Sequence, residues 1–371
     1  MRESQRKVVC VIGTRPEAIK MAPVIQRLGR EAWADLTVVA TAQHRELMDQ
    51  VLPLFGITPD LDLDLMRHDQ SLADFSARAL QAMDGVLADV APDLLLAQGD
   101  TSTVLAGAMA AFYRRIPFAH VEAGLRSGDM DNPFPEEFNR RAASMVASIH
   151  FAPTEEARGN LLAEGIAGER IAVTGNTVID SLLETARDDL PLPVAVPAGR
   201  RLLLVTAHRR ENFAGPMAGI CSAVARIVAD FPDVEVIWPL HPNPNVSGLV
   251  RDALGRTPRV HLCAPLDYRA FCATLKRCTL VLTDSGGLQE EAPALAKPLL
   301  VLRDVTERPE AVAAGVARLV GAHPNRIHAE ASRLLSDPAA YAAMASGVSP
   351  YGDGRAAERI VAVLRDRFAV H

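Results

Sequence analysis

The sequence contains no long uninterrupted hydrophobic run, no run of basic residues and few aromatic side chains. No stretch is long and apolar enough to cross a membrane as a helix, which needs about 20 residues. Aromatic residues make up 5% of the chain and form no stripe with basic ones, so a nucleic-acid partner is not expected. Residues 1–7 run directly into a strand-like segment and lack the apolar core of a signal peptide. We therefore expect a cytoplasmic protein.

The five cysteines form no C-x-x-C pair and stand mostly in apolar runs. This pattern is typical of buried, reduced thiols in the cytosol rather than of a zinc site. No set of His, Asp and Glu residues has the spacing of metal ligands, so we expect no required metal. The G-x-S-x-G elbow of serine hydrolases and the Gly-Lys-Ser/Thr of a P-loop are also missing. The net charge of −6 and a charged fraction of 23% are ordinary for a globular chain.

What the chain does have is a regular alternation of apolar runs with helical stretches. Continuous Val, Leu and Ile runs separated by helices predict parallel sheets that are covered on both faces. The expected strands fall into two sets of about six, at Val8–Gly13, Leu36–Thr41, Leu94–Gln98, Phe118–Glu122, Ile149–Pro153, Ile171–Gly175, Arg201–Ala207, Val234–Leu240, Val260–Pro265, Thr279–Asp284, Leu299–Arg303 and Ala317–Val320. With 371 residues, the chain is long enough for two domains. We expect an α/β protein with two doubly wound, Rossmann-like domains, residues 1–171 and 172–354.

Unusual polar residues gather where these expected strands end. In doubly wound sheets, ligands bind at the carboxyl ends of the strands. The sequences at these ends are G-T-R-P-E at 13–17, Q-G-D-T-S-T at 98–103, H-V-E-A-G-L-R at 120–126, T-A-H-R-R-E-N at 206–212, L-H-P-N-P at 240–244 and D-S-G-G at 284–287. Both halves are thus expected to direct polar loops into one interdomain active-site cleft.

The tripeptide Ser285-Gly286-Gly287 stands between an apolar run and a helical stretch. Free backbone N–H groups at a helix start can hold a phosphate, although a tight turn with Ser285 as N-cap is the commoner use of such a tripeptide. Glu290 and Glu291 follow, where a carboxylate either interacts with the helix dipole or accepts hydrogen bonds from ribose hydroxyls. Taken together, these features indicate a nucleotide diphosphate, although the spacing is not G-x-G-x-x-G.

Basic residues fall in or just beyond the strand-end loops of this acidic chain. Any one of them alone is more often a solvated charge, but several at the same end of two sheets favour a polyanionic ligand. They are Arg15, Lys20, His208, Arg209, Arg210 and His241.

Three carboxylates are candidate acids or bases. Glu122 lies inside an apolar strand, where an unpaired charge is costly, so it is either paired or has a raised pKa. A structural Glu122 bonded to arginines such as Arg126 is the alternative. Asp100 follows a glycine at a strand end, and Glu136 follows N-P-F-P, where acids are ordinary at a helix start.

A series of longer motifs runs in order along nearly the whole chain. The first half contains G-T-R-P-E-A-I-K-M-A-P from Gly13, T-A-Q-H-R-E-L-M-D-Q-V-L from Thr41, Q-G-D-T-S-T-V from Gln98, H-V-E-A-G-L-R-S-G-D from His120, P-F-P-E-E-F-N-R from Pro133 and V-T-G-N-T-V-I-D from Val173. The second half contains T-A-H-R-R-E-N-F from Thr206, L-H-P-N-P from Leu240, D-S-G-G-L-Q-E-E-A-P from Asp284 and S-P-Y-G-D-G from Ser349. With these motifs, the chain resembles the bacterial non-hydrolysing UDP-N-acetylglucosamine 2-epimerases.

The resemblance implies a GT-B type nucleotide-sugar fold and a homodimer, with a last helix, residues 355–371, that joins the first domain. It also implies interconversion of UDP-GlcNAc and UDP-ManNAc for cell-surface polysaccharide, with no cofactor. The residues that would hold UDP are Arg15, Ser285, Gly286, Gly287 and Glu291. Those that would surround the sugar and the breaking bond are Lys20, Asp100, Glu122, Glu136 and His208. A second UDP-GlcNAc, acting as activator, would bind at Gln43, Glu46, Arg210 and His241; some relatives have Gln at the position of Glu46.

Alternatives from other functional classes share much of this pattern. A hydrolysing epimerase would release UDP and free ManNAc, and the intact Q-H-R-E and H-R-R-E-N stretches favour the non-hydrolysing branch. A GT-B glycosyltransferase would need an acceptor groove, for which no specific feature is present. A non-catalytic binding protein would not need the surplus of carboxylates. Which carboxylate acts as base and which as acid is left open.

Overall fold

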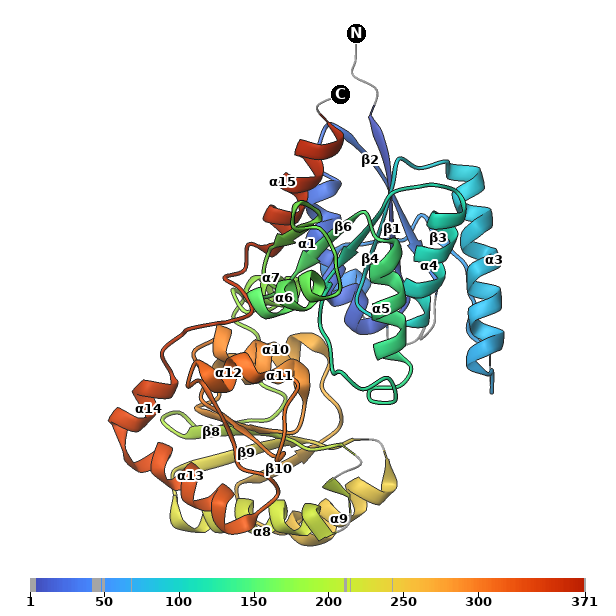
Figure 1. Ribbon diagram of the computed structural model, residues 1–371. Coiled ribbons are helices and arrows are strands. Elements are labelled where there is room, and N and C mark those ends of the chain that lie inside the picture. Colours follow the sequence, from blue (N-terminus) through green and yellow to red (C-terminus); the bar gives the residue numbers. More distant parts are fainter. Residues whose placement is uncertain are drawn as a thin grey trace. The chain divides into compact units, whose positions relative to one another are not determined.

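The computed structural model describes residues 5–41, 48, 51–67, 69–209, 212–213, 215–241 and 243–369. The chain divides into two compact units, coloured along the sequence in Figure 1. The first unit extends to Ser181 and resumes at Tyr351, and the second comprises Leu182–Pro350. The boundary expected at residue 171 falls at the start of a strand of the first sheet, so the first unit is longer than the sequence suggested.

The first unit is built on a parallel sheet with the order β3-β2-β1-β4-β5-β6-β7. Its described strands are β1 (Arg6–Ile12), β2 (Ala34–Ala40), β3 (Leu61–Asp62), β4 (Leu94–Gln98), β5 (Phe118–Val121), β6 (Ile149–Ala152) and β7 (Ile171–Val173). Its described helices are α1 (Arg15–Leu28), η1 (Leu52–Phe55), α3 (Leu72–Val90), α4 (Ser102–Tyr113), α5 (Glu136–Val146), α6 (Glu155–Ala163), η2 (Gly168–Arg170) and α15 (Ala356–Phe368). Helix α7 (Thr177–Thr185) runs across the boundary into the second unit.

The second unit repeats this plan with the strand order β10-β9-β8-β11-β12-β13. Its strands are β8 (Arg201–Thr206), β9 (Val234–Pro239), β10 (Val260–Cys263), β11 (Leu280–Thr283), β12 (Leu299–Val301) and β13 (Ala317–Leu319). Its helices are α8 (Gly215–Asp230), α9 (Pro244–Leu254), α10 (Tyr268–Arg277), α11 (Gly286–Ala294), α12 (Pro309–Ala313), α13 (Pro324–Ser336) and α14 (Pro338–Met344). In both sheets the order of the strands reverses at one point, between β1 and β4 and between β8 and β11, where doubly wound proteins bind ligands.

Burial explains why the apolar runs became strands. All residues of β4 and β11 are buried, as expected for strands covered by helices on both faces. Every apolar run predicted from the sequence coincides with a strand, with ends that differ by at most two residues. The α/β architecture with two Rossmann-like units is therefore confirmed. The sequence did not predict β3, which has two residues, both exposed, and so carries no hydrophobic signal.

Local sequence places the start of α1 directly behind β1. Thr14 is the N-cap, and Thr14 and Glu17 form a reciprocal capping box, with Pro16 in the first turn. At Gly13, a Cβ atom would lie 2.4 Å from the Thr103 hydroxyl oxygen, so only glycine fits between the loops after β1 and β4.

The last helix, α15, belongs to the first unit and packs against α1 (Figure 1). The Asp180 carboxylate accepts hydrogen bonds from the backbone N–H groups of Ala356 and Ala357, at 3.1 and 2.9 Å. At the other end of the helix, Arg6 Nε donates to the Phe368 carbonyl oxygen at 2.9 Å. The two ends of the chain are thereby joined within one unit.

All five cysteines are free, and four of them are buried. Burial raises the pKa of the Cys10 thiol to about 12, which makes it a poor nucleophile. In the part of the chain that the structure describes, no helix combines the length and apolar character needed to span a bilayer. Nor do three or more His, Cys, Asp or Glu side chains among the described residues gather as metal ligands would.

Candidate functional site

In the first unit, helix α1 and the loops after β4 and β5 bring Lys20, Asp100 and Glu122 together. Glu122 directly follows β5 and has a backbone φ of 61°, in the left-handed region that a non-glycine residue rarely adopts. Such strain persists where surrounding contacts maintain it, and it clusters at functional sites. The contacts of the Glu122 side chain fix the direction of its carboxylate.

The Glu122 carboxylate accepts hydrogen bonds from side chains of separate elements. Lys20 Nζ on α1 and Asn176 Nδ2 before α7 lie 2.6 and 2.7 Å from Glu122 Oε1. Gln98, the last residue of β4, donates to Oε2. Arg126, the partner considered in the alternative interpretation, forms an ion pair with Glu164 at 2.7 Å.

Asp100 has a different environment two residues beyond β4. Its carboxylate pairs with Arg140 of α5. Burial raises the pKa of Asp100 above its ordinary value, the neighbouring charge of Arg140 opposes this shift, and the negative charge of Glu122 adds to it. Glu136, in the first turn of α5, also acts on Asp100 as a nearby negative charge. The four groups of this unit that were predicted to surround the sugar are thus neighbours.

A buried carboxylate behind these residues joins two of the loops. Glu17 Oε2 accepts hydrogen bonds from the backbone N–H groups of Gly13 and Thr14, both at 2.7 Å. Its other oxygen accepts from Thr101 Oγ1 at 2.5 Å. Burial raises the pKa of Glu17 to about 7, because desolvation outweighs these hydrogen bonds. Arg15, the first residue of α1, is half-buried beside this loop.

In the second unit, Asp284 organises the loop that carries His208. Asp284 directly follows β11 and is fully buried. Its Oδ2 atom accepts from the backbone N–H groups of His208 and Arg209, both at 2.8 Å, and from Asn212 Nδ2 at 2.9 Å. The loops after β8 and β11 flank the reversal in strand order, so this carboxylate fixes one loop against the other at the expected ligand position.

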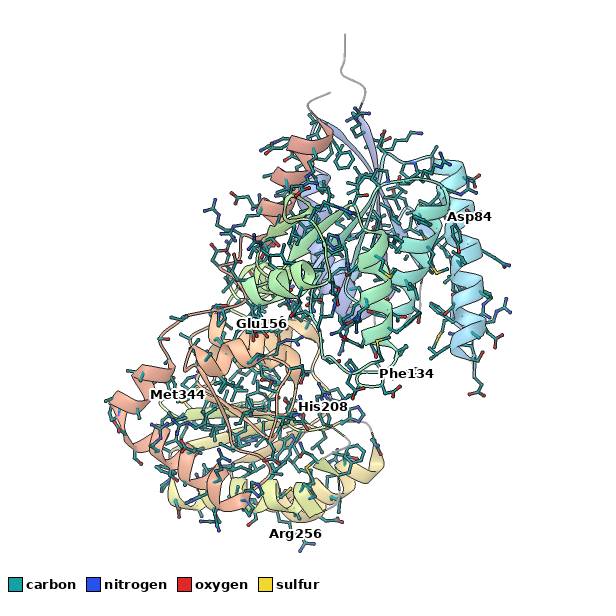
Figure 2. All side chains as sticks on the ribbon, in the orientation of Figure 1. Asp84, Phe134, Glu156, His208, Arg256 and Met344 are labelled. Carbon is teal, nitrogen blue, oxygen red and sulfur yellow. The ribbon has the colours of Figure 1, made fainter. Side chains whose placement is uncertain are left out.

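The His208 ring, labelled in Figure 2, projects from this loop and stacks on His241 with ring centroids 5.8 Å apart. Partial burial lowers the pKa of His208 below its ordinary value, while the Asp284 carboxylate acts in the opposite direction. The Nδ1 atom lies 3.5 Å from Asp284 Oδ1. A neutral imidazole at neutral pH can accept or donate a proton during a reaction.

The D-S-G-G turn begins α11, with Ser285 as the N-cap residue. The Ser285 side chain makes no capping hydrogen bond, although the interpretation of the tripeptide as a capped turn predicts one. The first N–H groups of the helix follow at Gly286 and Gly287. Glu290 is buried and pairs with Arg308, whereas Glu291 lies near Tyr268 and Cys272. The two glutamates therefore have different surroundings, and Glu290 forms an ion pair within the second unit.

Sequence reasoning missed four residues that organise these groups: Gln98, Arg140, Asn176 and Asp284. Each lay in a quoted motif, but only folding brings it to its partner; Asn176 and Glu122, for example, are 54 positions apart. The activator residues predicted at Gln43, Glu46 and Arg210 lie outside the described residues. Of that set, only the position of His241 is described, against His208.

Comparison with known proteins identifies the family. The family model for UDP-N-acetylglucosamine 2-epimerase matches residues 26–365. The chain belongs to the UDP-N-acetylglucosamine 2-epimerase family. It is 48% identical to the UDP-N-acetylglucosamine 2-epimerase of Salmonella typhimurium, over 97% of this chain and 98% of that protein. Identity to the Bacillus subtilis epimerase is also 48%, over 96% and 94% of the two chains.

Solved structures of the family share the whole fold. The Neisseria meningitidis UDP-GlcNAc 2-epimerase, bound to UDP-GlcNAc, is 43% identical and superposes with a TM-score of 0.89. The match covers 97% of this chain and all of that one. The two-sheet architecture described above is therefore that of the epimerase family, and the strand-end residues lie where this fold binds ligands.

Proposed function

We propose that the protein interconverts UDP-GlcNAc and UDP-ManNAc by eliminating UDP and adding it back. The C2 proton of the sugar is not acidic enough for simple removal. Breaking the C1–O bond to UDP, before or together with proton transfer, makes C1 cationic and acidifies C2. The products of this half-reaction are UDP and a glucal. Returning a proton to the opposite face of C2, and UDP to C1, completes the epimerisation without any cofactor.

The observation that carries the proposal is the cluster of Lys20, Asp100 and Glu122. Removing a proton from one face of a carbon and returning one to the opposite face needs acid–base groups on both faces. Glu122 accepts hydrogen bonds from Lys20 and Asn176, and Asp100 is a second carboxylate nearby whose pKa is raised by burial. Glu136 and His208 are further candidates for proton transfer.

The second unit supports the leaving-group half of the reaction. Departing UDP needs donors and positive charge where negative charge develops. The start of α11 offers backbone N–H groups at Gly286 and Gly287. It also offers the hydroxyl of Ser285, which makes no capping hydrogen bond. Arg15 and Lys20 of the first unit complete the set of residues that would bind the substrate. Glu291 would accept hydrogen bonds from the ribose hydroxyls.

Proton NMR of the purified protein with UDP-GlcNAc in D₂O, without added metal, tests the proposal. Formation of UDP-ManNAc with deuterium at C2 is expected, because the proton removed exchanges with solvent before one returns. Free ManNAc and UDP as the only products would indicate the hydrolysing reaction instead. An unchanged spectrum from folded protein would refute epimerisation of this substrate, and transfer to added acceptors would then be tested.

We further propose that a second UDP-GlcNAc activates the enzyme, at a site that includes His241 with Gln43, Glu46 and Arg210. The stacking of His241 on His208 gives this site a direct contact with a proposed catalytic residue. The expected result is a sigmoidal dependence of rate on UDP-GlcNAc that becomes hyperbolic in His241→Ala. A hyperbolic wild-type curve would contradict activation.

A homodimer in the cytoplasm that supplies ManNAc units for cell-surface polysaccharide is the biological setting we propose. Helices α4 and α5 pack together and expose the large apolar side chains Phe112, Phe138 and Met145, which suits association with a second copy. The free, buried thiols suit a reducing compartment. Light scattering would test the dimer, and a monomer at micromolar concentration would contradict it.

A further inference from the structure

Asn176 lies where three parts of the first unit meet. It precedes α7, and its side-chain oxygen accepts from the backbone N–H of Val178 at 3.1 Å, as an N-cap does. Its backbone N–H donates to the carbonyl oxygen of Tyr351 at 2.6 Å. Its side-chain nitrogen donates to Glu122 Oε1 at 2.7 Å. One residue thus contacts a helix start, the returning chain and a proposed catalytic carboxylate.

The backbone around Asn176 is closely packed. Gly175 has a φ of 88°, and a Cβ atom on it would lie 3.2 Å from the Cα of Gly352. Gly352 has a φ of 132°, and a Cβ atom there would lie 3.3 Å from the Cα of Gly175. Asn176 and Tyr351 are both buried. The two chain segments therefore meet backbone to backbone, which leaves Asn176 little freedom to move.

The position of Asn176 along the chain adds to its importance. The chain passes between its two units twice, within α7 after Ser181 and again between Pro350 and Tyr351. Asn176 caps the helix that contains the first crossing and binds the carbonyl of the residue that ends the second. Asn176 therefore connects both crossings to Glu122 by hydrogen bonds.

Glu122 depends on such contacts because its own backbone is strained, with a φ of 61°. Charged and titratable groups face it from several elements: Lys20 forms an ion pair, and Asp100 and His120 interact with it electrostatically. Asn176 shares the Oε1 atom with Lys20 and supplies a neutral donor in a buried, fixed position.

We infer that Asn176 is a positioning residue of the proposed reaction, which orients the Glu122 carboxylate and ties it to both crossings between the units. The inference rests on the proposed epimerisation. In Asn176, the side-chain oxygen caps α7 and the side-chain nitrogen binds Glu122, so capping and positioning use different atoms. The two roles can therefore be separated by substitution.

Asn176→Asp and Asn176→Ser make this separation. Asp and Ser are as effective N-caps as Asn, so both variants retain the start of α7. Neither variant retains the amide donor to Glu122, and Asp places a second carboxylate beside it. The matched control is Gln26→Glu in α1, which converts a half-buried amide that donates to the Phe55 carbonyl at 2.8 Å, away from the site.

Both Asn176 variants should lower kcat by about 10- to 100-fold, the scale for losing a hydrogen bond to a charged group, with KM little changed. In Asn176→Asp, the acid limb of the pH–rate profile should also move up by about one pH unit, since a nearby carboxylate favours protonated Glu122. Gln26→Glu should retain the wild-type rate and profile.

A purely structural role for Asn176 predicts another pattern, with both capping variants close to wild type in rate and no movement of the acid limb. That result would overturn the inference. If Asn176→Asp does not fold, the rate of Asn176→Ser decides, because it introduces no charge. An inactive but folded wild-type protein would instead refute the proposed function, so failure of the two proposals can be distinguished.

Discussion

Replacing Asp284 by Asn should weaken the second unit and impair turnover together. The Asp284 carboxylate accepts three hydrogen bonds at one oxygen, from His208 N, Arg209 N and Asn212 Nδ2, in a fully buried position. An Asn side chain can place its amide oxygen at the same point, so the donors remain satisfied but lose the negative charge.

The magnitude follows from the difference between charged and neutral hydrogen bonds. Bonds to charged groups contribute about 1.5–3 kcal/mol and neutral ones about 0.5–1.5 kcal/mol, a difference of about 1 kcal/mol each. Three such bonds at Asp284 give a loss of about 3 kcal/mol in the free energy of unfolding. For a unit of this size, that corresponds to a fall in Tm of about 10 °C.

Tryptophan fluorescence provides the assay. The chain has two tryptophans, and Trp238 is fully buried in the core of the second unit. A Trp33→Phe background therefore makes thermal unfolding of the second unit visible by itself. The rate of epimerisation, measured on the same samples below Tm, should fall about tenfold because the loop carrying His208 is less well fixed.

The matched control is Asp337→Asn, in the same unit. Asp337 accepts from the backbone N–H groups of Ala339 and Ala340 at 2.9 and 3.1 Å, but it is exposed and far along the chain from the site. It should leave both Tm and rate nearly unchanged, because Asn caps a helix about as well as Asp does. An Asp284→Asn protein whose Tm and rate both match the background would refute the role assigned to Asp284.

Three further predictions concern other parts of the site. Glu122→Gln should retain UDP binding in titration calorimetry but lose turnover by about 10²-fold or more, and near-wild-type rates would exclude Glu122 from the mechanism. Glu17 has a pKa of about 7 in the fold against 4.5 ordinarily, so it binds more protons folded than unfolded, and stability falls as pH rises between these values. Glu17→Gln cannot ionise and should show a smaller fall in Tm between pH 4.5 and 7; an identical fall would contradict the raised pKa. In Gly286→Ala, the new Cβ would lie 2.9 Å from Glu307 Oε1, and binding of UDP should weaken about tenfold, the scale of a lost phosphate contact. Unchanged affinity would show that phosphate does not approach the start of α11.

The sequence predicts the strands well because a strand that is buried on both faces is a continuous apolar run in the sequence. Each continuous Val/Leu/Ile run became a strand, whereas the exposed two-residue strand Leu61–Asp62 left no trace. The domain boundary was harder to predict. Ile171–Val173 is short and half-exposed, and only its pairing with β6 shows that it belongs to the first sheet.

Some residues of the candidate site could be predicted from the sequence, and their partners could not. Motifs at strand ends pointed to Lys20, Asp100 and Glu122, since parallel strands bring their carboxyl ends to one edge. The partner of Glu122 could not be predicted, because Lys20 is 102 positions away and Arg126 only four. The use of Ser285 was equally open, since a capping serine and a ligand-binding serine have the same sequence context; the structure shows that its side chain makes no capping hydrogen bond.

The return of α15 to the first unit has a consequence for biosynthesis. The second unit, which ends at Pro350, is synthesised before the helix that packs on α1. Arg6 can form its hydrogen bond to Phe368 only after that residue, 362 positions later, has been made. Domains usually complete their folding from the N-terminus during synthesis. In this chain the order of completion is reversed, because the half that carries Lys20, Asp100 and Glu122 becomes whole only after α15 has been made.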